Sequence, residues 1–340
     1  MSVRQRGLEL AFAIVAVCLS SSPGQAQTAA PDLEPLGIGL ESVAYPYPAQ
    51  YLLLRMEGED VKLAFMDVEP FAPANGKTVV LMHGRNFFGA YWKDTIGLLS
   101  GRGYRVVVPD QIGFGKSTKP DILHSFHVHA YNTKQLLDYL GVKKVTLVGH
   151  SLGGTMAVRF TLMYPDYVER LILEDPIGLE DYRIKVPFAT RDELAAEARS
   201  QTRERIETFM KDFFASWKPA FQIFADVQYR WALGPESDLI ARTAAQTYTM
   251  AYEQPVLYEM PLIKPPTLLI VGEKDRAAIG RNRVTPEVRA TLGLYPELAK
   301  KAAQAMTDCK LVLIPDVAHV PHLEAPERFH EELLRFLDPK

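Results

Sequence analysis

The sequence predicts an α/β fold: a mostly parallel, doubly wound sheet with a helical cap inserted into it. Short apolar strands alternate with amphipathic helices over the first half of the chain, which is the pattern of consecutive strand–helix–strand units. This alternation stops near residue 178, where a stretch rich in helix formers and aromatic residues begins, and strand-like runs return after residue 264. We therefore expect a core domain made of residues 27–177 and 265–340, with residues 178–264 forming the cap.

The first 26 residues have the order of a secretory signal peptide. Arg4 and Arg6 precede the apolar run "LELAFAIVAVCL", and the small-residue stretch "SSSPGQA" follows it. The sequence thus predicts an exported protein, periplasmic or secreted, with cleavage near Ala26. The apolar run is well short of the roughly 20 residues that span a bilayer, so no stable membrane insertion is expected.

Length and composition are those of a globular protein. The chain has 340 residues, 47% of them hydrophobic, and a formal net charge of -3. Loss of Arg4, Arg6 and Glu9 with the signal peptide makes the chain one charge more negative, and no lysine or arginine cluster suggests nucleic acid as a partner. Cys309 is the only cysteine after residue 26, so we expect no internal disulfide and a buried thiol. Nothing in the composition indicates an oligomeric state.

The expected elements follow one another in the order that this fold requires. The runs "YLLLRM" and "VKLAFMDV" predict an early hairpin. Helices are expected near 91–101, 129–140 and 153–164. Short β-branched or apolar runs are typical of parallel strands buried on both faces, and they occupy residues 78–84, 104–110, 144–149, 169–175, 265–275 and 309–316.

The stretch "TLVGHSLGGT" places Ser151 on a sharp turn directly after a strand. A run with helix-compatible apolar spacing follows, which completes the strand, turn and helix setting of a nucleophilic serine. Such a turn forces the serine into an unfavourable backbone conformation, so its neighbours must be small. Gly149, Gly153 and Gly154 meet that demand.

Other chemically active residues follow the carboxyl ends of other strands, where ligands of such sheets bind. His83 ends the first of the parallel strands and leads into Arg85. Asp275 follows the run "LIVG", and His319 follows the run "LIPD". Together with Ser151, these residues give the chain order serine, aspartate, histidine.

These segments resemble the α/β-hydrolase superfamily, in its branch of cap-bearing esterases, C–C bond hydrolases and epoxide-hydrolase-like enzymes. The sequence is most similar to exported bacterial hydrolases of this branch, over nearly all of the chain after the signal peptide. The resemblance implies the α/β-hydrolase fold and a Ser–His–Asp triad. The segments that carry it are "HGRNFFGAYW", "PDQIGFGKSTKP", "GHSLGG", "YPDYVERLILEDPIGLEDY", "GEKDRAAIG" and "AHVPHLEAPERF".

The chemistry of such a site asks for these residue types. A serine hydroxyl is a poor nucleophile until an imidazole takes its proton, and a carboxylate holds that imidazole in the correct tautomer. We assign these roles to Ser151, His319 and Asp275. The oxyanion needs two backbone N–H donors, for which the resemblance implies Arg85 and Leu152. The Arg85 side chain would also suit an anionic substrate, and no cofactor or metal ion enters this scheme.

Several of these roles have a rival nearby. His322 follows His319 by three residues, and in the resembled pattern the first histidine is catalytic while the second supports it. Asp175 also follows a strand, but Pro176 favours an extended backbone before it, so we expect Asp175 to anchor the hinge to the cap. His83 is expected to brace the oxyanion loop.

Two further motifs imitate other kinds of site. The stretch "GFGKST" resembles the end of a nucleotide-binding P-loop, but the first glycine of that motif would fall at Asp110. The stretch "HSFHVH" places His124, His127 and His129 at a spacing that could hold a metal ion. Cysteine or carboxylate partners at ligand spacing do not accompany them in the sequence, so we expect solvated loop histidines.

The function that these residues favour is hydrolysis of a carboxylic ester, through an acyl-enzyme, on a small to medium-sized apolar substrate. A C–C bond hydrolase, an aminopeptidase or a cofactor-free haloperoxidase-like enzyme would keep the same triad, and a silent binding protein on a hydrolase scaffold is the alternative outside enzymes. Serine at the turn excludes haloalkane dehalogenases and epoxide hydrolases, which carry aspartate there. Aromatic residues of the cap are expected to pack it onto the core and in part to line the pocket: Phe209, Phe213, Phe214, Trp217, Phe221, Phe224, Tyr229 and Trp231.

Overall fold

The structure is a computed structural model that describes residues 33–338. The predicted signal peptide, residues 1–26, lies outside these residues, so export stays a prediction. From Glu34 onward the chain forms one compact unit. Within the described part of the chain, no helix combines the length and the apolar character needed to cross a membrane.

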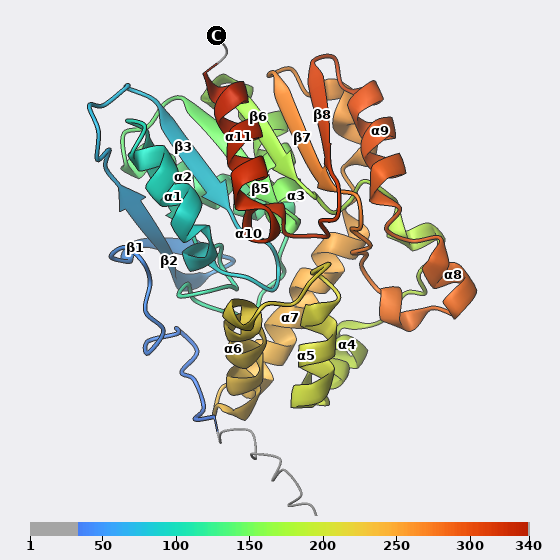
Figure 1. Ribbon diagram of the computed structural model, residues 1–340. Coiled ribbons are helices and arrows are strands. Elements are labelled where there is room, and N and C mark those ends of the chain that lie inside the picture. The colour runs from blue at the N-terminus through green and yellow to red at the C-terminus, as the bar shows by residue number, and fades with distance from the viewer. Residues whose placement is uncertain (1–32, 339–340) are drawn as a thin grey trace, which may run out of the picture. The chain divides into compact units, whose positions relative to one another are not determined.

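An eight-stranded sheet runs through this unit in the order β1-β2-β4-β3-β5-β6-β7-β8 (Figure 1). Strands β1 and β2 form the predicted antiparallel hairpin, β2 pairs antiparallel with β4, and the remaining pairs are parallel. The predicted α/β fold with a mostly parallel sheet is therefore confirmed. The strands are β1 (Gln50–Met56), β2 (Glu59–Val68), β3 (Thr78–Met82), β4 (Arg105–Pro109), β5 (Val145–His150), β6 (Val168–Glu174), β7 (Thr267–Gly272) and β8 (Cys309–Ile314).

Helices cover both faces of the sheet. On one face lie α1 (Lys93–Ser100) and α11 (Pro326–Leu337), and on the other lie α2 (Phe126–Tyr139), α3 (Leu152–Met163) and α9 (Tyr295–Ala305). Two short helices, α8 (Pro286–Ala290) and α10 (Pro321–Glu324), belong to the loops after β7 and β8. Short 3₁₀ segments occupy Gly89–Trp92, Pro165–Tyr167, Tyr182–Ile184, Pro219–Phe221, Leu257–Leu262 and Arg281–Arg283.

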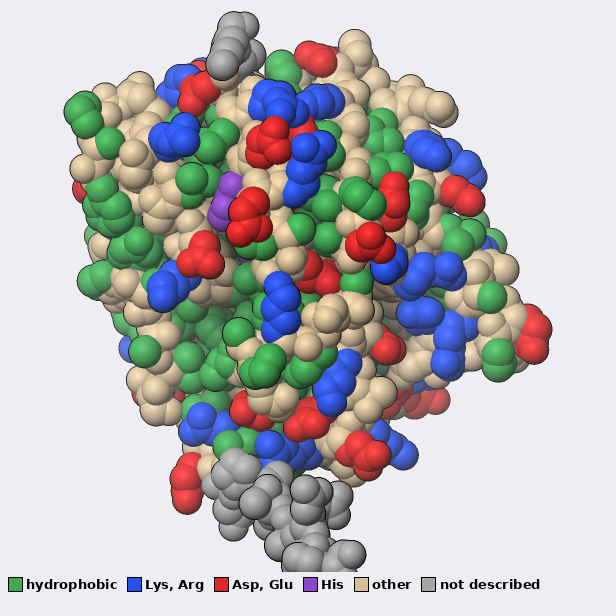
Figure 2. Space-filling view, in the orientation of Figure 1, with side chains coloured by type: hydrophobic (Ala, Val, Ile, Leu, Met, Phe, Trp, Pro, Cys, Tyr) green, Lys and Arg blue, Asp and Glu red, His purple; other side chains and the backbone are tan. Residues whose placement is uncertain are grey.

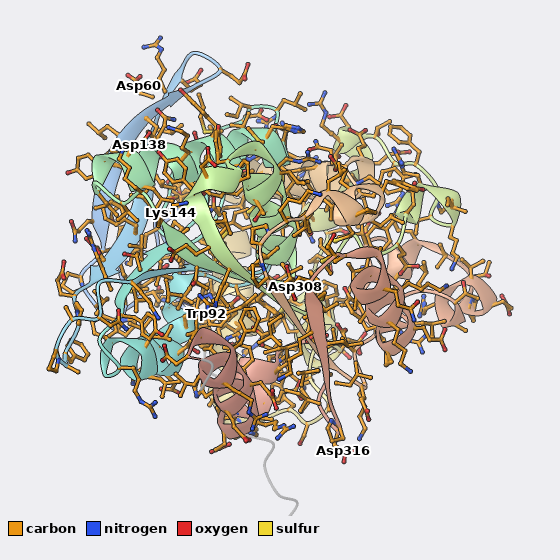
Figure 3. The ribbon with its side chains drawn as sticks, turned by 90° about the horizontal axis from the view of Figure 1, so that it is seen from above. Asp60, Trp92, Asp138, Lys144, Asp308 and Asp316 are labelled. Atoms are coloured by element: carbon orange, nitrogen blue, oxygen red, sulfur yellow. The ribbon has the colours of Figure 1, made fainter. Side chains whose placement is uncertain are left out.

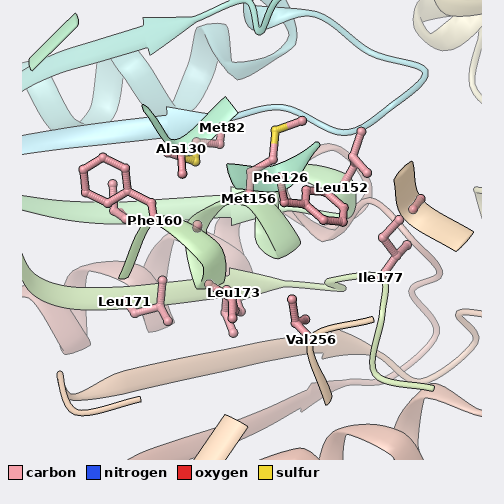
Figure 4. Close-up of a cluster of buried hydrophobic side chains, with 14 of the residues drawn as sticks. Met82, Phe126, Ala130, Leu152, Met156, Phe160, Leu171, Leu173, Ile177 and Val256 are labelled. Carbon is pink, nitrogen blue, oxygen red and sulfur yellow. The ribbon is translucent and has the colours of Figure 1, made fainter. Parts of the chain in front are cut away.

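Strand side chains alternate between two hydrophobic cores, one on each face of the sheet. Val80 and Met82 of β3 belong to the core that includes α2 and α3, while Val79 and Leu81 belong to the core that includes α1 and α11. Figure 4 shows part of the first core, in which side chains from α2, α3 and the neighbouring strands pack together. All six residues of β5 are buried, as expected for a central parallel strand covered on both faces.

The chain between β6 and β7 is helical throughout the regular elements that the structure describes there. These are α4 (Arg191–Arg199), α5 (Arg203–Lys211), α6 (Gln222–Leu233) and α7 (Ser237–Glu253), and they lie together below the sheet in Figure 1. Helix α4 begins with a capping box, in which Thr190 and Glu193 bond each other's backbone N–H. The division into core and cap at residues 178 and 264 stays a prediction.

Helix α2 begins earlier than the sequence predicted, and this overturns the expectation of solvated histidines. The Ser125 side chain accepts a hydrogen bond from the Val128 N–H and caps the helix, so the helix starts three residues before position 129. As a result His124 and His129 are buried and hydrogen-bonded to each other, with 3.1 Å between Nδ1 and Nε2, and His127 alone is exposed. Burial lowers the pKa of His124 to about 4, so this histidine is neutral.

The packing of α3 against the sheet generates a stability prediction. A Cβ atom at Gly153 would lie 2.3 Å from the Met82 carbonyl oxygen and 2.6 Å from that of His83. Backbone atoms cannot give way locally, so Gly153→Ala should lower the free energy of unfolding by about 1–3 kcal/mol, as overpacking does. Urea unfolding followed by circular dichroism measures this loss.

Gly97 of α1 offers a matched control, because its added Cβ would meet only the Tyr47 hydroxyl at 4.0 Å. Since alanine favours a helix interior over glycine by roughly 0.5–1 kcal/mol, Gly97→Ala should leave the stability unchanged or raise it. Equal stabilities of the two variants would contradict the close contact between α3 and β3.

Candidate active site

Ser151 lies at the end of β5, in the turn that leads into α3. Its backbone has φ 54° and ψ −119°, a region that residues with a side chain rarely adopt. The Ser151 N–H donates to the Glu174 carbonyl oxygen at 2.9 Å. The approach of strand and helix is so close that a Cβ on Gly149 would lie 2.4 Å from the Gly153 carbonyl oxygen. The turn is therefore strained, as the sequence predicted, and it needs glycine at both positions.

The structure brings the predicted serine, histidine and aspartate together in one hydrogen-bond chain. Ser151 Oγ lies 2.8 Å from His319 Nε2, and His319 Nδ1 lies 2.7 Å from Asp275 Oδ2. In the neutral imidazole the Nδ1–H donates to the carboxylate, which leaves Nε2 to accept the serine proton. All three residues are buried, and the serine is 6% exposed. The arrangement can therefore deprotonate the Ser151 hydroxyl during attack on a bound electrophile.

Asp175 lies beside this chain, and its backbone differs from the expectation. The residue has φ 40°, so the extended conformation expected before Pro176 is wrong. Two hydrogen bonds hold the observed conformation: the Asp175 N–H donates to Ile270, and the Asp175 carboxyl accepts from the Gly272 N–H at 3.1 Å. Burial, and after it the negative charge of Asp275, raises the pKa of Asp175 well above its ordinary value. Both effects favour the neutral form of the Asp175 carboxyl group.

Asp175, Asp275 and His319 each offer a ligand atom, all within 4.8 Å of one another. Within this group, His319 Nδ1 and Asp275 are already hydrogen-bonded to each other. A cation at this place would compete with the 2.7 Å bond from His319 Nδ1 to Asp275. We therefore describe these groups as proton-sharing partners.

His322 forms a separate pair with Glu174. Its backbone N–H donates to Glu174 Oε1 at 2.7 Å, and its Nδ1 lies 2.9 Å from both carboxylate oxygens. The ring stacks on Trp92 with 4.0 Å between centroids. Figure 3 shows Trp92 inside the molecule, whereas Asp60 and Asp316 lie at its edge. The pair anchors the loop after β8 to the end of β6.

His83 makes two hydrogen bonds within the loop that follows β3. Its Nδ1 lies 2.8 Å from the Gly84 carbonyl oxygen, and its Nε2 accepts from the Gln111 N–H at 3.1 Å. Burial lowers the pKa of His83, which is consistent with a neutral ring that donates through Nδ1. These bonds are those of a bracing residue, and neither involves Ser151.

Two residues of the site escaped the sequence analysis. The Tyr91 hydroxyl accepts from the Gly84 N–H at 3.0 Å and lies 2.9 Å from His150 Nδ1, while His150 Nε2 lies 2.7 Å from the His319 carbonyl oxygen. Burial, followed by the charges of His319 and His322, lowers the pKa of His150 well below its ordinary value. A neutral His150 thus links the loop after β3 to the histidine loop. His150 stands in the quoted "GHSLGG" motif, whereas no local pattern marks Tyr91.

The backbone N–H groups of Arg85 and Leu152 lie on the two segments that meet at Ser151. A Cβ on Gly84 would come within 3.1 Å of Ser151 Cβ, so the loop after β3 reaches the serine. Among residues 33–338, neither N–H donates to a protein acceptor. Both groups are therefore able to donate to a ligand oxygen held at the serine.

Aromatic side chains reach the site from the helical segment between β6 and β7. The Phe213 carbonyl oxygen accepts from the His319 N–H at 3.0 Å, and the Phe213 ring lies 5.2 Å from the imidazole. Phe224 packs edge-on against Phe87 at 5.0 Å, and Phe87 in turn contacts the His150 ring. Of the eight aromatic residues singled out in the sequence, Phe213 thus contacts His319 directly, and Phe224 reaches His150 through Phe87.

The stretch that resembles a P-loop is held by bonds within the protein. Buried Lys119 donates through Nζ to the Gly115 and Ser117 carbonyl oxygens. Asp110 accepts from the Gly89 N–H at 2.7 Å. These bonds give the segment a structural role in joining neighbouring loops.

Comparison with known proteins agrees with this geometry. A profile described as the Alpha/beta hydrolase family matches residues 79–332. A probable hydrolytic enzyme from Pseudomonas aeruginosa PAO1, of known crystal structure, is 41% identical, with a TM-score of 0.88 over 90% of this chain and 99% of that one. A thermophilic esterase from Thermogutta terrifontis is 25% identical, with a TM-score of 0.62 over 85% of this chain and 98% of that one.

Curated relatives match a shorter segment. A 2-hydroxy-6-oxo-6-phenylhexa-2,4-dienoate hydrolase from Burkholderia cepacia is 37% identical over 108 residues, which are 31% of this chain and 38% of that enzyme. An uncharacterized protein from Mycobacterium bovis is 37% identical over 105 residues, 30% of its own length. The chain thus spans about a third of the length of these curated relatives. Because the family profile covers well over half of the chain and the fold agrees with it, the chain belongs to the alpha/beta hydrolase family.

Proposed function

We propose that this hydrolase cleaves carboxylic esters through an acyl-enzyme, with Ser151 as nucleophile, His319 as general base and Asp275 as the acid that orients it. The observation that carries this proposal is the unbroken hydrogen-bond chain from the serine hydroxyl through the imidazole to the carboxylate. The backbone N–H groups of Arg85 and Leu152 form the proposed oxyanion hole.

The first half of the reaction makes the acyl-enzyme. Ser151 Oγ bonds to the ester carbonyl carbon while its proton passes to His319 Nε2, and the carbonyl electron pair moves onto the oxygen. The two N–H donors stabilise this oxyanion, with a contribution of about 3–4 kcal/mol each. The imidazolium, held by Asp275, then gives its proton to the departing alkoxide as the C–O bond breaks.

The second half releases the acid. A water molecule gives a proton to His319 Nε2 as its oxygen attacks the acyl carbon, and the new oxyanion occupies the same N–H donors. When this intermediate collapses, the bond to Ser151 Oγ breaks and the imidazolium returns a proton to that oxygen. Asp275 stays ionised throughout, because its role is to stabilise the imidazolium and not to accept its proton.

A C–C bond hydrolase is the second candidate, since the chain is 37% identical over 108 residues to the 2-hydroxy-6-oxo-6-phenylhexa-2,4-dienoate hydrolase of Burkholderia cepacia. The rings of Phe87, Phe213 and Phe224 pack against one another beside the site, and an apolar surrounding of this kind suits either substrate class. A panel of esters, amides and vinylogous diketones separates the candidates. Higher kcat/KM for esters supports our proposal, and preferential cleavage of the diketones would replace it.

Replacement of the nucleophile tests the proposal directly. Ser151→Ala should abolish covalent labelling by a fluorophosphonate and nearly all ester turnover, because the bond-forming oxygen is lost. The melting temperature should fall little, since the side chain donates its only described hydrogen bond to His319. Undiminished turnover by the purified variant would exclude Ser151 as the nucleophile.

The two aspartates provide a matched pair of substitutions. Asp275→Asn should lower kcat by about 10⁴, because an amide fixes the wrong imidazole tautomer. Asp175→Asn should cost far less, since asparagine can accept from the Gly272 N–H and still donate to Asp275 as the protonated acid does. Kinetics on folded variants give the ranking, and the opposite order would move the orienting acid to Asp175.

Asp175 also predicts a pH effect on stability. Its raised pKa means that the folded protein keeps a proton that the unfolded chain has released, so this contribution to stability is present at low pH and declines as pH rises. The melting temperature of Asp175→Asn should therefore fall less than that of the wild type between acidic and alkaline pH. A larger fall in the variant would show that Asp175 is ionised.

We further propose that the protein is exported and loses residues 1–26. This rests on the charged, apolar and small-residue order of the N-terminal sequence. Mass spectrometry of the protein isolated from its native host should find an N-terminus near Gln27. Recovery of chains that begin at Met1 would contradict the proposal.

A further inference from the structure

The Arg85 side chain carries a positive charge beside the proposed oxyanion hole. Its Nη2 donates to the Ala244 carbonyl oxygen of α7 at 3.0 Å. Its Nε is buried and has no hydrogen-bond partner in the described part of the chain. Since the preceding Gly84 approaches Ser151, the guanidinium lies within one arginine side chain of the reacting serine. A bound substrate can therefore satisfy the donor that the protein leaves unpaired.

The charges around Arg85 also favour binding of a negatively charged group there. Within residues 33–338 no carboxylate forms an ion pair with its guanidinium. Glu197 is the acidic side chain whose charge acts on it, but that carboxylate already accepts from Asn282 Nδ2 and Arg283 Nη1, each at 2.6 Å. A partly buried cation without a counter-charge is destabilising, and a substrate anion would offset this cost.

Tyr248 of α7 adds a second unpaired donor. The Arg85 guanidinium carbon lies 5.9 Å from the centre of the Tyr248 ring, and the Tyr248 hydroxyl is buried without a hydrogen-bond partner among the described residues. A Cβ on Gly280 would lie 2.5 Å from this hydroxyl, so Tyr248 meets the loop that follows Asp275. The two donors thus lie between the oxyanion loop, α7 and the triad's acid loop.

The loop that follows β7 contributes further positive charge. Burial, and after it the neighbouring charge of Arg276, lowers the pKa of Arg281, while the charge of Asp275 acts to raise it. Figure 2 shows lysine and arginine side chains gathered on the right of the face, over the segment that carries α8.

We propose that the hydrolase acts on esters that carry a carboxylate, and that the Arg85 guanidinium and the Tyr248 hydroxyl bind this carboxylate. The proposal rests on the ester hydrolysis proposed above. Because the same residue supplies an oxyanion N–H and the guanidinium, the carboxylate lies within one arginine side chain of the scissile carbonyl. Half-esters of short dicarboxylic acids have this geometry.

Steady-state kinetics with the monomethyl and dimethyl esters of succinic, glutaric and adipic acid test the proposal. The wild type should prefer at least one half-ester to its neutral diester. Arg85→Met keeps the backbone N–H, so the ratio of kcat/KM for the half-ester to kcat/KM for the diester should fall about 10- to 100-fold, mainly through a higher KM for the half-ester. Arg85→Lys should retain part of the preference, and Tyr248→Phe should lose part of it.

A binding measurement separates failure of this proposal from failure of ester hydrolysis. Calorimetric titration of Ser151→Ala with monomethyl glutarate should show binding that Arg85→Met in the same background removes. If the wild type cleaves no ester and this binding is found, the carboxylate site stands and the proposed reaction falls. If esters are cleaved but half-esters and diesters are treated alike, with no binding that depends on Arg85, the carboxylate site falls.

Arg281→Met is the matched control, because Arg281 is a neighbouring arginine whose Nε is likewise buried without a described partner. It should leave the preference for half-esters in place. Loss of the preference in Arg281→Met but not in Arg85→Met would overturn the assignment. An equal fall in kcat for half-ester and diester in Arg85→Met would also overturn it, because that result is expected of a side chain that only ties the oxyanion loop to α7.

Discussion

The positive φ of Ser151 is the constraint on which the site depends. A turn held at φ 54° is unfavourable, so the surrounding structure must fix it from several sides. The Ser151 N–H is bonded to the end of β6, and Gly149 and Gly153 bring strand and helix within a distance that no side chain would allow. This conformation directs the Ser151 hydroxyl away from the edge of the sheet and toward His319.

Acidic residues at the end of β6 hold the two loops that supply the rest of the triad. Glu174 accepts the Ser151 N–H with its backbone and binds His322 with its side chain, so one residue fixes both the turn and the histidine loop. The next residue, Asp175, bonds the Gly272 N–H at the end of β7 and contacts Asp275. Two ionised carboxylates at that contact would repel each other, and this repulsion adds to burial in favouring the neutral form of Asp175.

The sequence predicted those parts of the molecule that depend on local pattern. Buried parallel strands, the glycine-flanked turn and the chain order of Ser151, Asp275 and His319 are all readable within short windows, and the structure places these side chains in contact. The capped start of α2 was also readable, since Ser125 stands before the helix, but the histidines beside it suggested a loop. Because the start of α2 was placed too late, His124 and His129 were wrongly expected to be exposed to solvent.

Other features depend on packing between distant segments and had no local signal. Tyr91 and His150 meet across 59 positions of the chain, and the pKa of Asp175 is raised by its burial and then by the charge of Asp275, both of which arise from the fold. The backbone of Asp175 shows the same limit. A following proline disfavours the helical region, but hydrogen bonds to neighbouring strands decided which conformation the residue took.

Hydrogen-bonding side chains differ between the two sides of the site in whether the protein itself provides their partners. On the sheet side, both ring nitrogens of His83 and of His150 are hydrogen-bonded within the protein, so these rings have no capacity left for a ligand. At α7, by contrast, two donors are without a hydrogen-bond partner among the described residues: Arg85 Nε and the hydroxyl of Tyr248, which belongs to that helix. Because α7 and its neighbours belong to the helical segment between β6 and β7, changes there can alter which substrates bind while the strand ends keep the triad in place. Under the proposed roles of Arg85 and Tyr248, the charge of the substrate is selected at α7, while the bond is cleaved at the ends of the strands.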